Sequence, residues 1–455
     1  MDLDGQRLAL LGYGVENQAL GAWLTQHGFT FAVCDTDPDG ARPATHGGES
    51  CHDAVVEWRL GDTALSRLED FDILFRSPGI RLRRSELVAA ERAGICLSSG
   101  IDLFLERCQA PVIGVTGTKG KGTTASMLFA ILHAVGMPAR LGGNIGIPPL
   151  TFLDELGADE QVILELSSFQ LQDLGRSPAG AVLLPIATDH LDYHETHAEY
   201  VGAKGEICRQ QSSGDWVLAA AGCATARELA CQSAGGQLRF SGTSAVHGDG
   251  CWVEEERIRW RSGGSETVVG SIDDVRIPGV HNLHNACAAV GAAILAGVTP
   301  EETVAGLRAF VGLPHRLETV AEHAGVTFVN DSLATTPEAA TAGLRAWVPR
   351  AVVLIAGGSG KGADFALLGE AIAQDAAALV TMGHEGGRIV GAARQGGVAG
   401  VVRQDCQSME AAVTAAIALA KPGGVVLLSP ACASFGMFAS YAERGEAFRR
   451  AVTDL

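Results

Sequence analysis

Short apolar runs alternate with stretches of helical spacing along most of the chain. Near the N-terminus, "RLALLGYG" and "FTFAVCDTD" flank residues 17–27, where apolar positions recur at helical intervals. The same order returns in "APVIGVTGTKGKGTT" with the residues after it, and again around "VTFVNDS", "AVVLIAGG" and "GGVVLLSP". Apolar strands alternating with amphipathic helices are typical of a mostly parallel sheet covered by helices. The pattern therefore predicts an α/β protein.

Three such units account for the 455 residues, because a domain usually holds roughly 100–200 residues. We predict domains at 1–108, 109–313 and 314–455, the first and third of them Rossmann-like. Weaker β-type runs such as "CWVEEERIRW" fill residues 214–278. They predict a small, mainly antiparallel section inside the central domain.

The central unit opens with a glycine-rich loop. The run "VTGTKGKGTT" follows a strand and begins a helix, which is the context in which backbone N–H groups face a phosphate. Gly117 and Gly120 would allow the tight turn, and Lys121 would reach the terminal phosphates of a nucleotide. We therefore predict a P-loop ATPase-like central domain.

This loop departs from the usual phosphate-loop pattern. Val115 stands where the first glycine belongs, and Gly122 directly follows the lysine. A metal-binding hydroxyl must then come from Thr123 or Thr124. The alternative interpretation is an ordinary glycine-rich turn, which the two lysines and the hydroxyl residues around it argue against.

A second glycine turn, "GYGVEN", is a weaker signal. Asn17 replaces the third glycine of the dinucleotide-binding pattern that would begin at Gly12 and Gly14. A nicotinamide-dependent dehydrogenase is the alternative from another class. It leaves the central loop unexplained, and a plain tight turn or a diphosphate site at the next helix also fits.

Charged residues follow two apolar strands of the central unit, in "LELSSFQL" and "TDHLDYH". Sites in open α/β sheets form at such strand ends. Glu165 and His190 are predicted to hold Mg²⁺ together with substrate phosphates, since Mg²⁺ takes few protein ligands. Taken singly, each of the two is more simply interpreted as a solvated loop residue. Lys204 alone reads as a surface residue of a helix.

Charge and composition exclude some classes of binding partner and indicate the cellular compartment. A net charge of -18 argues against nucleic acid or an anionic membrane as a partner. The 11 cysteines contain no C-x-x-C pair, which favours a reducing compartment. Asp2 and Asp4 stand where a signal peptide would carry positive charge, and no uncharged apolar run approaches the roughly 20 residues of a membrane span. We expect a cytoplasmic monomer.

Motifs throughout the chain resemble those of Mur ligases and follow their order. They are "GVTGTKGKGTT", "GGNIG", "LELSSFQL", "TDHLDYH", "PGVHNLHNACAA", "LPHRLE", "NDSLATT", "GGSGKGADF" and "LSPACASFGMFASYAERGEAF". The last motif resembles the glutamate-adding branch. This resemblance implies ATP-dependent ligation of glutamate to UDP-N-acetylmuramoyl-L-alanine through an acyl phosphate, in peptidoglycan precursor synthesis. A folate-type polyglutamate ligase is a more distant alternative, against which the first Rossmann-like unit argues.

The resemblance also implies roles for matching residues. ATP would be bound by Gly117, Thr118, Lys119, Gly120, Lys121, Gly122, Thr123, Thr124, Asn282, Arg316 and Asp331. The UDP substrate would be bound by Gly14, Thr36, Ser77, Gly79 and Asn144. Glutamate would be bound by Thr335, Lys361, Ser434 and Tyr441. Mg²⁺ would be held by Thr123, Glu165, His190 and a carbamylated Lys204. The implied catalytic residues are Lys121, His190 and Lys204.

Three departures from the family pattern bear on the glutamate enantiomer. Lys119 replaces an asparagine, Leu333 replaces a lysine, and Tyr441 replaces a phenylalanine. The altered loop and "DSLATTPEA" resemble the variant ligase that adds L-glutamate. We therefore predict that L-glutamate is favoured, with D-glutamate as the alternative.

Overall fold

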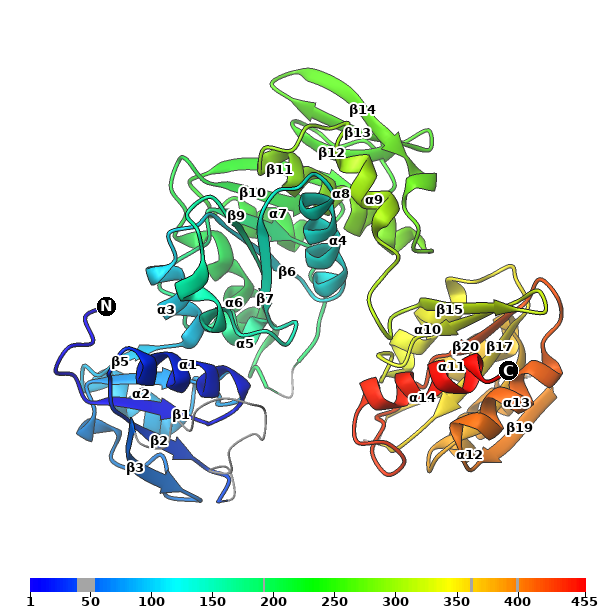
Figure 1. Ribbon diagram of the computed structural model, residues 1–455, viewed down its shortest axis with the longest axis horizontal. Coiled ribbons are helices and arrows are strands. Elements are labelled where there is room, and N and C mark those ends of the chain that lie inside the picture. Colours follow the sequence, from blue (N-terminus) through cyan, green and yellow to red (C-terminus); the bar gives the residue numbers. More distant parts are fainter. Residues whose placement is uncertain (39–53, 191–192, 361–362, 398–400) are drawn as a thin grey trace. The chain divides into compact units, whose positions relative to one another are not determined.

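The structure is a computed structural model, which describes residues 1–38, 54–190, 193–360, 363–397 and 401–455. It separates into two compact units (Figure 1). Unit 1 comprises Met1–Val275 and Val280–Phe310, and unit 2 comprises Arg276–Gly279 and Val311–Leu455. The described residues form two sheets in unit 1 and one in unit 2. The predicted α/β class is confirmed, while the boundaries at 108/109 and 313/314 remain a proposal.

The first sheet of unit 1 is parallel and has the strand order β3-β2-β1-β4-β5. Its strands are β1 Leu8–Leu11, β2 Phe31–Asp35, β3 Val55–Leu60, β4 Ile73–Arg76 and β5 Cys96–Ser98, and its helices are α1 Val15–Gln26, α2 Ser85–Arg92 and α3 Gly100–Arg107. Strands β1 and β4 are buried along their whole length, as expected for a sheet covered on both faces. The strand order changes direction between them, and the carboxyl ends at such a switch point are where sheets of this kind bind ligands.

Asn17 stabilises the turn that follows β1. Its buried side-chain amide donates to the carbonyl oxygens of Leu11 at 3.1 Å, Gly12 at 2.8 Å and Phe75 at 3.1 Å. A glycine has no side chain for these bonds, which explains the departure from the dinucleotide-binding pattern. The turn after β1 is thereby tied to β4.

The second sheet has the order β14-β13-β12-β11-β10-β9-β6-β8-β7. Its strands are β6 Val112–Thr116, β7 Ala139–Gly143, β8 Gln161–Glu165, β9 Gly180–Leu183, β10 Trp216–Ala220, β11 Gly236–Ser241, β12 Gly250–Glu254, β13 Arg257–Ser262 and β14 Ser265–Ser271. The prediction for residues 214–278 is partly wrong. Only β12 to β14 pair antiparallel. Strands β10 and β11 instead extend the parallel sheet and are connected through α7 Ala224–Ala230. The first part of this segment is a strand-helix-strand crossover, which the short apolar runs in the sequence did not indicate.

Helices pack on this sheet in two groups. They are α4 Lys121–Ala134, α5 Ser168–Leu171, α6 His197–Arg209, α7 Ala224–Ala230, α8 Val280–Leu295 and α9 Thr303–Ala309. Helix α4 lies over β7 and β8, beside α8 and α9 (Figure 1), whereas α6 contacts α5, α7 and β6. A Cβ on Gly306 of α9 would lie 2.3 Å from the Cα of Ile131. Glycine therefore permits the close approach that holds α9 against α4.

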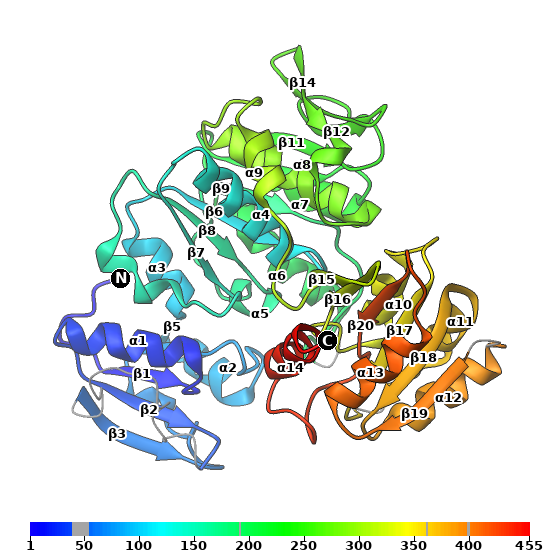
Figure 2. The ribbon, with the colours of Figure 1, turned by 45° about the vertical axis from the view of Figure 1, so that its right-hand side comes forward.

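Unit 2 contains a sheet with the order β15-β16-β20-β17-β18-β19. Its elements are β15 Glu318–His323, β16 Val326–Asn330, β17 Val352–Gly357, β18 Ala376–Met382, β19 Val401–Cys406, β20 Val425–Leu428, α10 Pro337–Arg345, α11 Ala366–Asp375, α12 Gly386–Gln395, α13 Met409–Leu419 and α14 Tyr441–Thr453. Along β17, Leu354 packs in a core with α10, α11 and α12, whereas Ile355 packs in a core with α13 and α14 (Figure 2). Successive side chains of a strand point to opposite faces, so the two helix groups cover opposite faces of this sheet.

Candidate active site

The phosphate-loop candidate lies between β6 and α4. Gly120 is the N-cap of α4 with φ +88°, and Gly117 has φ +156°. A Cβ on Gly117 would lie 2.5 Å from the Cβ of Leu184, and one on Gly120 would lie 2.5 Å from Oδ1 of Asn285. Both positions therefore require glycine. The loop delivers the N-terminus of a 14-residue helix, where N–H groups and the helix dipole favour an anion.

Lys121 and Thr118 are both bonded within or beside this loop. The ammonium group of Lys121 donates to the carbonyl oxygens of Gly117 and Thr118, each at 3.2 Å. The hydroxyl of Thr118 lies 2.8 Å from the Tyr200 hydroxyl, and the N–H of Ala187 donates to it at 2.9 Å. The Thr118 side chain therefore holds the loop in place, while Lys121 lies over it.

The structure distinguishes the two candidate metal hydroxyls. Thr124 Oγ1 donates to Oδ1 of Asn285 at 3.3 Å, and the amide of Asn285 donates to Oδ1 of Asn282 at 3.0 Å. Within the described residues, the hydroxyl of Thr123 is buried and has no hydrogen-bond partner. A buried hydroxyl without a partner needs an explanation, and a metal ion at the phosphate loop supplies one. Sequence reasoning missed Asn285, although its spacing of three from Asn282 places both on one helix face.

Glu165 and Asn144 meet at the carboxyl ends of β8 and β7. The amide of Asn144 donates to Oε1 of Glu165 at 2.8 Å, and its backbone N–H donates to the Glu165 carbonyl at 2.8 Å. Gly143 has φ +90°, and a Cβ there would lie 2.3 Å from the same carbonyl. The predicted metal ligand and the predicted substrate residue are therefore neighbours.

Lys204 is buried against the phosphate loop, so its single-residue interpretation as a surface lysine is wrong. Its side chain projects from α6, and the residue is 1% exposed. Its ammonium group donates to the Gly117 carbonyl at 2.9 Å and to Oγ1 of Thr116 at 3.3 Å, and it lies 4.8 Å from the ring centroid of Tyr200. Burial, with help from the positive charge of Lys121, lowers the Lys204 pKa to about 7.

His190 lies in the segment after β9 and adopts φ +52°. Its side chain is 45% exposed, its Nε2 lies 3.9 Å from Oδ2 of Asp189, and its ring meets that of Phe169 edge-on with the centroids 4.9 Å apart. The same Asp189 oxygen lies 3.3 Å from the ammonium group of Lys119. The unusual lysine of the loop is thus paired with a carboxylate beside His190.

The candidates for the UDP substrate lie at strand ends of the first sheet. Gly14 caps α1, and a Cβ there would lie 3.7 Å from the Ser77 hydroxyl. The N–H of Ser77 donates to the Leu11 carbonyl at 2.8 Å. Thr36 and Gly79 are exposed after β2 and β4 respectively. The structure therefore brings Gly14 and Ser77 together at the switch point of this sheet, between β1 and β4.

The glutamate candidates lie in unit 2. Thr335 is exposed after β16, Ser434 is buried after β20, and Tyr441 begins α14 with a side chain that is 44% exposed. Lys361 lies outside the described residues. Strands β16, β20 and β17 are neighbours in the sheet, and the carboxyl ends of parallel neighbours lie at one edge. Thr335 and Ser434 therefore follow adjacent strands at the same edge.

Asp331 and Arg444 are two of the buried polar residues near that edge. Asp331 accepts from the Ser429 hydroxyl at 2.7 Å and from the Leu317 N–H at 3.1 Å, and burial raises its pKa to about 7. Arg444, which sequence reasoning missed, donates to the carbonyl oxygens of Ser332 at 2.8 Å and Cys432 at 3.0 Å. It thereby joins the loops that follow β16 and β20.

The nucleotide candidates are divided between the two units. Asn282 lies in unit 1, beside the phosphate loop, whereas Arg316 and Asp331 lie in unit 2. A joint contact of these three residues with a nucleotide therefore remains a prediction. Across the described residues, no helix has the length and apolarity to cross a membrane.

Comparison with known proteins identifies relatives along the whole chain. The Mur ligase middle domain matches residues 115–293, and the Mur ligase, glutamate ligase domain matches residues 315–432. A UDP-N-acetylmuramoylalanine–D-glutamate ligase of Symbiobacterium thermophilum is 40% identical over 99% of this chain and 98% of its own length. The protein of the same name in Acetivibrio thermocellus is 35% identical over 100% of this chain and 97% of its own length.

These names contradict the prediction that L-glutamate is favoured, because each specifies D-glutamate. They also fit neither the folate-type ligase nor the dehydrogenase. The structure shows why the two substitutions in unit 2 were weak indicators. The Leu333 N–H donates to the His315 carbonyl at 2.9 Å, and the partly exposed ring of Tyr441 meets His315 edge-on. Leu333 carries no charge, and the Tyr441 hydroxyl lies on a partly exposed ring, so neither substitution by itself indicates the enantiomer.

Solved structures agree on the fold. The UDP-N-acetylmuramate-alanine ligase of Thermotoga maritima matches with a TM-score of 0.59 at 17% identity, covering 99% of each chain. The MurF ligase of the same organism, solved in complex with ADP, matches with a TM-score of 0.56 at 18% identity, covering 93% of this chain and 89% of that one. The full-length relatives establish more than the fold, and the chain belongs to the Mur ligase family of ATP-dependent, amide-bond-forming ligases.

Proposed function

We propose that this enzyme joins D-glutamate to UDP-N-acetylmuramoyl-L-alanine at the expense of ATP, in peptidoglycan precursor synthesis in the cytoplasm. The names of its full-length relatives support this reaction. The observation that carries the proposal is the convergence of Lys121, Thr123 and the buried Lys204 on one phosphate loop. The first domain would hold the UDP substrate, the second ATP and the third glutamate.

The reaction would proceed in two steps. The ATP γ-phosphoryl group is transferred to the alanyl carboxylate, giving an acyl phosphate and ADP. The glutamate amine then attacks the carbonyl carbon, a tetrahedral intermediate forms, and phosphate leaves. The protein contributes positioning and charge neutralisation, as in other phosphoryl transfers.

The residues of the phosphate loop would perform distinct parts of this work. Lys121 and the N-terminus of α4 neutralise charge on the phosphates. Mg²⁺ fits the unpartnered Thr123 hydroxyl and would neutralise phosphate charge when held by Thr123, Glu165, His190 and a carbamylated Lys204. Asn144 would contact the muramoyl substrate while bonded to Glu165.

Glutamate recognition would come from unit 2, through Thr335, Lys361, Ser434 and Tyr441. Closure that brings glutamate to the acyl phosphate is expected to precede the second step. Arg316 and Asp331 are proposed to contact the nucleotide, together with Asn282.

Parallel assays with enantiopure glutamate test this function. Phosphate release should require ATP, UDP-N-acetylmuramoyl-L-alanine and glutamate together, with D-glutamate favoured at least about tenfold in kcat/KM. A mirror substrate leaves one charged group poorly paired, which costs roughly 1–3 kcal/mol or more. Preference for L-glutamate would contradict the assignment of the D enantiomer but not the assignment as a ligase. Absence of phosphate release with either enantiomer would remove the ligase assignment.

Replacing Thr123 with valine should raise the Mg²⁺ concentration needed for half-maximal turnover by at least about tenfold, because the unpartnered hydroxyl would be lost. Thr124→Val is the matched control: it removes a hydrogen bond to Asn285 and should cost about 1 kcal/mol of stability with little change in Mg²⁺ dependence. Magnesium titrations and thermal unfolding measure both effects. Equal Mg²⁺ dependence in the two variants would show that Thr123 is not the metal hydroxyl.

A further inference from the structure

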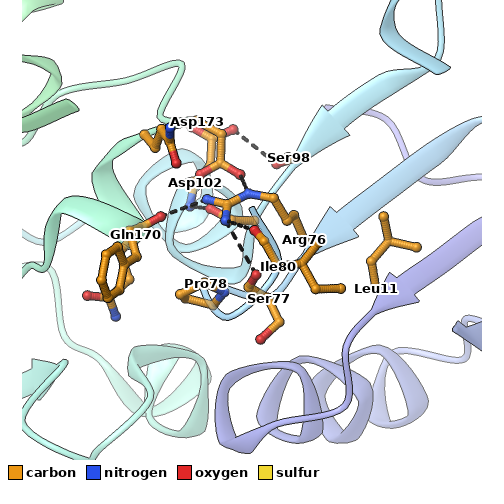
Figure 3. Close-up of polar contacts among 12 residues, drawn as sticks. Leu11, Arg76, Ser77, Pro78, Ile80, Ser98, Asp102, Gln170 and Asp173 are labelled. Atoms are coloured by element: carbon orange, nitrogen blue, oxygen red, sulfur yellow. Dashed lines mark hydrogen bonds and ion pairs between the residues drawn. The ribbon is translucent and has the colours of Figure 1, made fainter. Parts of the chain in front are cut away.

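Arg76 is a buried arginine immediately before the Ser77-Pro78-Gly79 turn. It is the last residue of β4, and its side chain is 0% exposed. Figure 3 shows its guanidinium between the turn that follows β4 and the segment of α5 with Asp173. Neither the phosphate loop nor any candidate ligand contact accounts for a charge buried at this place.

The guanidinium binds to both sides of the boundary between the two sheets. On its own side, Nη1 donates to the Ile80 carbonyl at 2.6 Å. On the other side, Nε donates to Oδ2 of Asp173 at 2.6 Å, and Nη2 donates to the Phe169 carbonyl at 2.7 Å. Phe169 belongs to α5, and Asp173 follows that helix. The planar guanidinium therefore connects the Ser77-Pro78-Gly79 turn to the segment after β8.

Tyr193 extends this connection to the segment that carries His190. Its hydroxyl accepts from Nη1 of Arg76 at 3.1 Å and lies 2.9 Å from the carbonyl oxygens of both Pro78 and Ile80. Its backbone N–H donates to the His190 carbonyl at 3.1 Å. The Phe169 ring also contacts the His190 ring. Arg76 is thus linked to His190, a predicted metal ligand, through its bonds to Tyr193 and Phe169.

Stability alone does not require such an ion pair. Replacing a buried pair with apolar residues is often neutral or stabilising, because both charges must lose their hydration. The two sheets have other links as well: Asp102 accepts from the Gly175 N–H at 2.9 Å, and Trp23 Nε1 donates to Asp154 at 3.2 Å. The Arg76 network therefore adds directional bonds to an association that has other contacts as well.

We propose that Arg76 is a positioning residue, which holds the turn for the UDP substrate at a set place relative to α5 and the His190 segment. The inference rests on the proposed function. A substrate anchored at the first sheet must present its carboxylate to ATP over the second sheet, with the reacting atoms about 3–3.5 Å apart. A guanidinium with bonds in three directions sets that separation, as a point charge would not.

The decisive variant is R76M/D173L, which removes both charges, so that Asp173 is not left as a buried carboxylate without its partner. Its melting temperature should stay close to that of the wild type, while kcat/KM for UDP-N-acetylmuramoyl-L-alanine should fall about 100-fold, mostly in kcat, since a shift of about 1 Å costs about that much. The KM for ATP should not change. R76K should show a similar loss of kcat, because lysine keeps the charge but not the planar fork.

Tyr193→Phe provides a milder second test, should the double variant fold poorly. It removes one hydroxyl and no charge, and should lower kcat about tenfold at an unchanged melting temperature. Arg59→Met is the matched control. Arg59 is paired with Glu57 at 2.8 Å and Asp70 at 2.9 Å inside the first sheet's own domain, so its loss should lower the melting temperature without altering kcat/KM.

The outcomes separate the two proposals. If the wild type consumes ATP with both substrates but a stable R76M/D173L retains normal kcat/KM, the role of Arg76 is purely structural and the inference is wrong. Normal turnover by Tyr193→Phe would overturn it equally if the double variant is unstable. If the wild-type enzyme itself shows no substrate-dependent turnover, the proposed function fails, and the role of Arg76 falls with it.

Discussion

Lys121→Ala is expected to lower kcat for ATP consumption by about 1000-fold or more, the scale of losing a preorganised group that stabilises the transition state. The lysine is the first residue of α4, and its ammonium group lies over the loop, 3.2 Å from the Gly117 and Thr118 carbonyl oxygens. The other lysine of the loop, Lys119, is paired with Asp189, so it does not replace this charge. Turnover with saturating substrates is the measurement.

The fold should survive this change. Lys121 is only partly buried and belongs to a loop-helix junction outside the apolar core, so thermal unfolding should remain near that of the wild type. Lys421→Ala, at an exposed lysine after α13, controls for the loss of one positive charge. Near-normal turnover by a folded Lys121→Ala protein would show that the phosphate-loop assignment is wrong.

Lys204→Ala should also be close to inactive, with a loss of about 1000-fold. The side chain is buried, and its ammonium group is bonded to the Gly117 carbonyl at 2.9 Å. A carbamate on this nitrogen would place a carboxylate beside the phosphate loop. Millimolar chloride or short carboxylates should then restore part of the activity. Full activity of Lys204→Ala would contradict any role at the site.

The lowered pKa gives this prediction a pH dependence. Burial lowers the Lys204 pKa to about 7, so far more of this amine is neutral near pH 7 than of an ordinary lysine, where the neutral fraction is roughly one in a few thousand. Only the neutral amine attacks carbon dioxide. Carbon-13 NMR with labelled bicarbonate should therefore show a carbamate signal that is absent from Lys204→Ala. An active wild-type enzyme without that signal would remove the modification from the mechanism.

The pH dependence of the free energy of unfolding independently tests whether the pKa of the buried amine is lowered. Bicarbonate must be excluded from this measurement. Between pH 7 and the pKa of about 10.4 for an unfolded lysine, the unfolded state binds more protons than the folded state. The free energy of unfolding should therefore rise with pH across this window. Lys204→Ala should lack that part of the rise in denaturant titrations at several pH values.

Much of the architecture is local and was readable from the chain. Buried strands such as β6 and β17 are largely apolar runs that lead into a glycine turn, and parallel strands covered on both faces need that composition. Gly117 and Gly120 have backbone angles that strongly favour glycine. The phosphate loop was therefore predictable from a few adjacent residues, whereas the parallel pairing of β10 and β11 was not, because it depends on partners far along the chain.

The sequence by itself determined the alternation of strands and helices, the phosphate loop and the family motifs, because each depends on neighbouring residues. Only the tertiary structure decided which threonine hydroxyl is left for a metal, since the partner of Thr124 lies 161 residues away. It likewise decided that Lys204 is buried and that Arg76 joins two sheets. Burial and hydrogen-bond partners come from contacts between distant segments, and such contacts leave no periodic pattern in the chain.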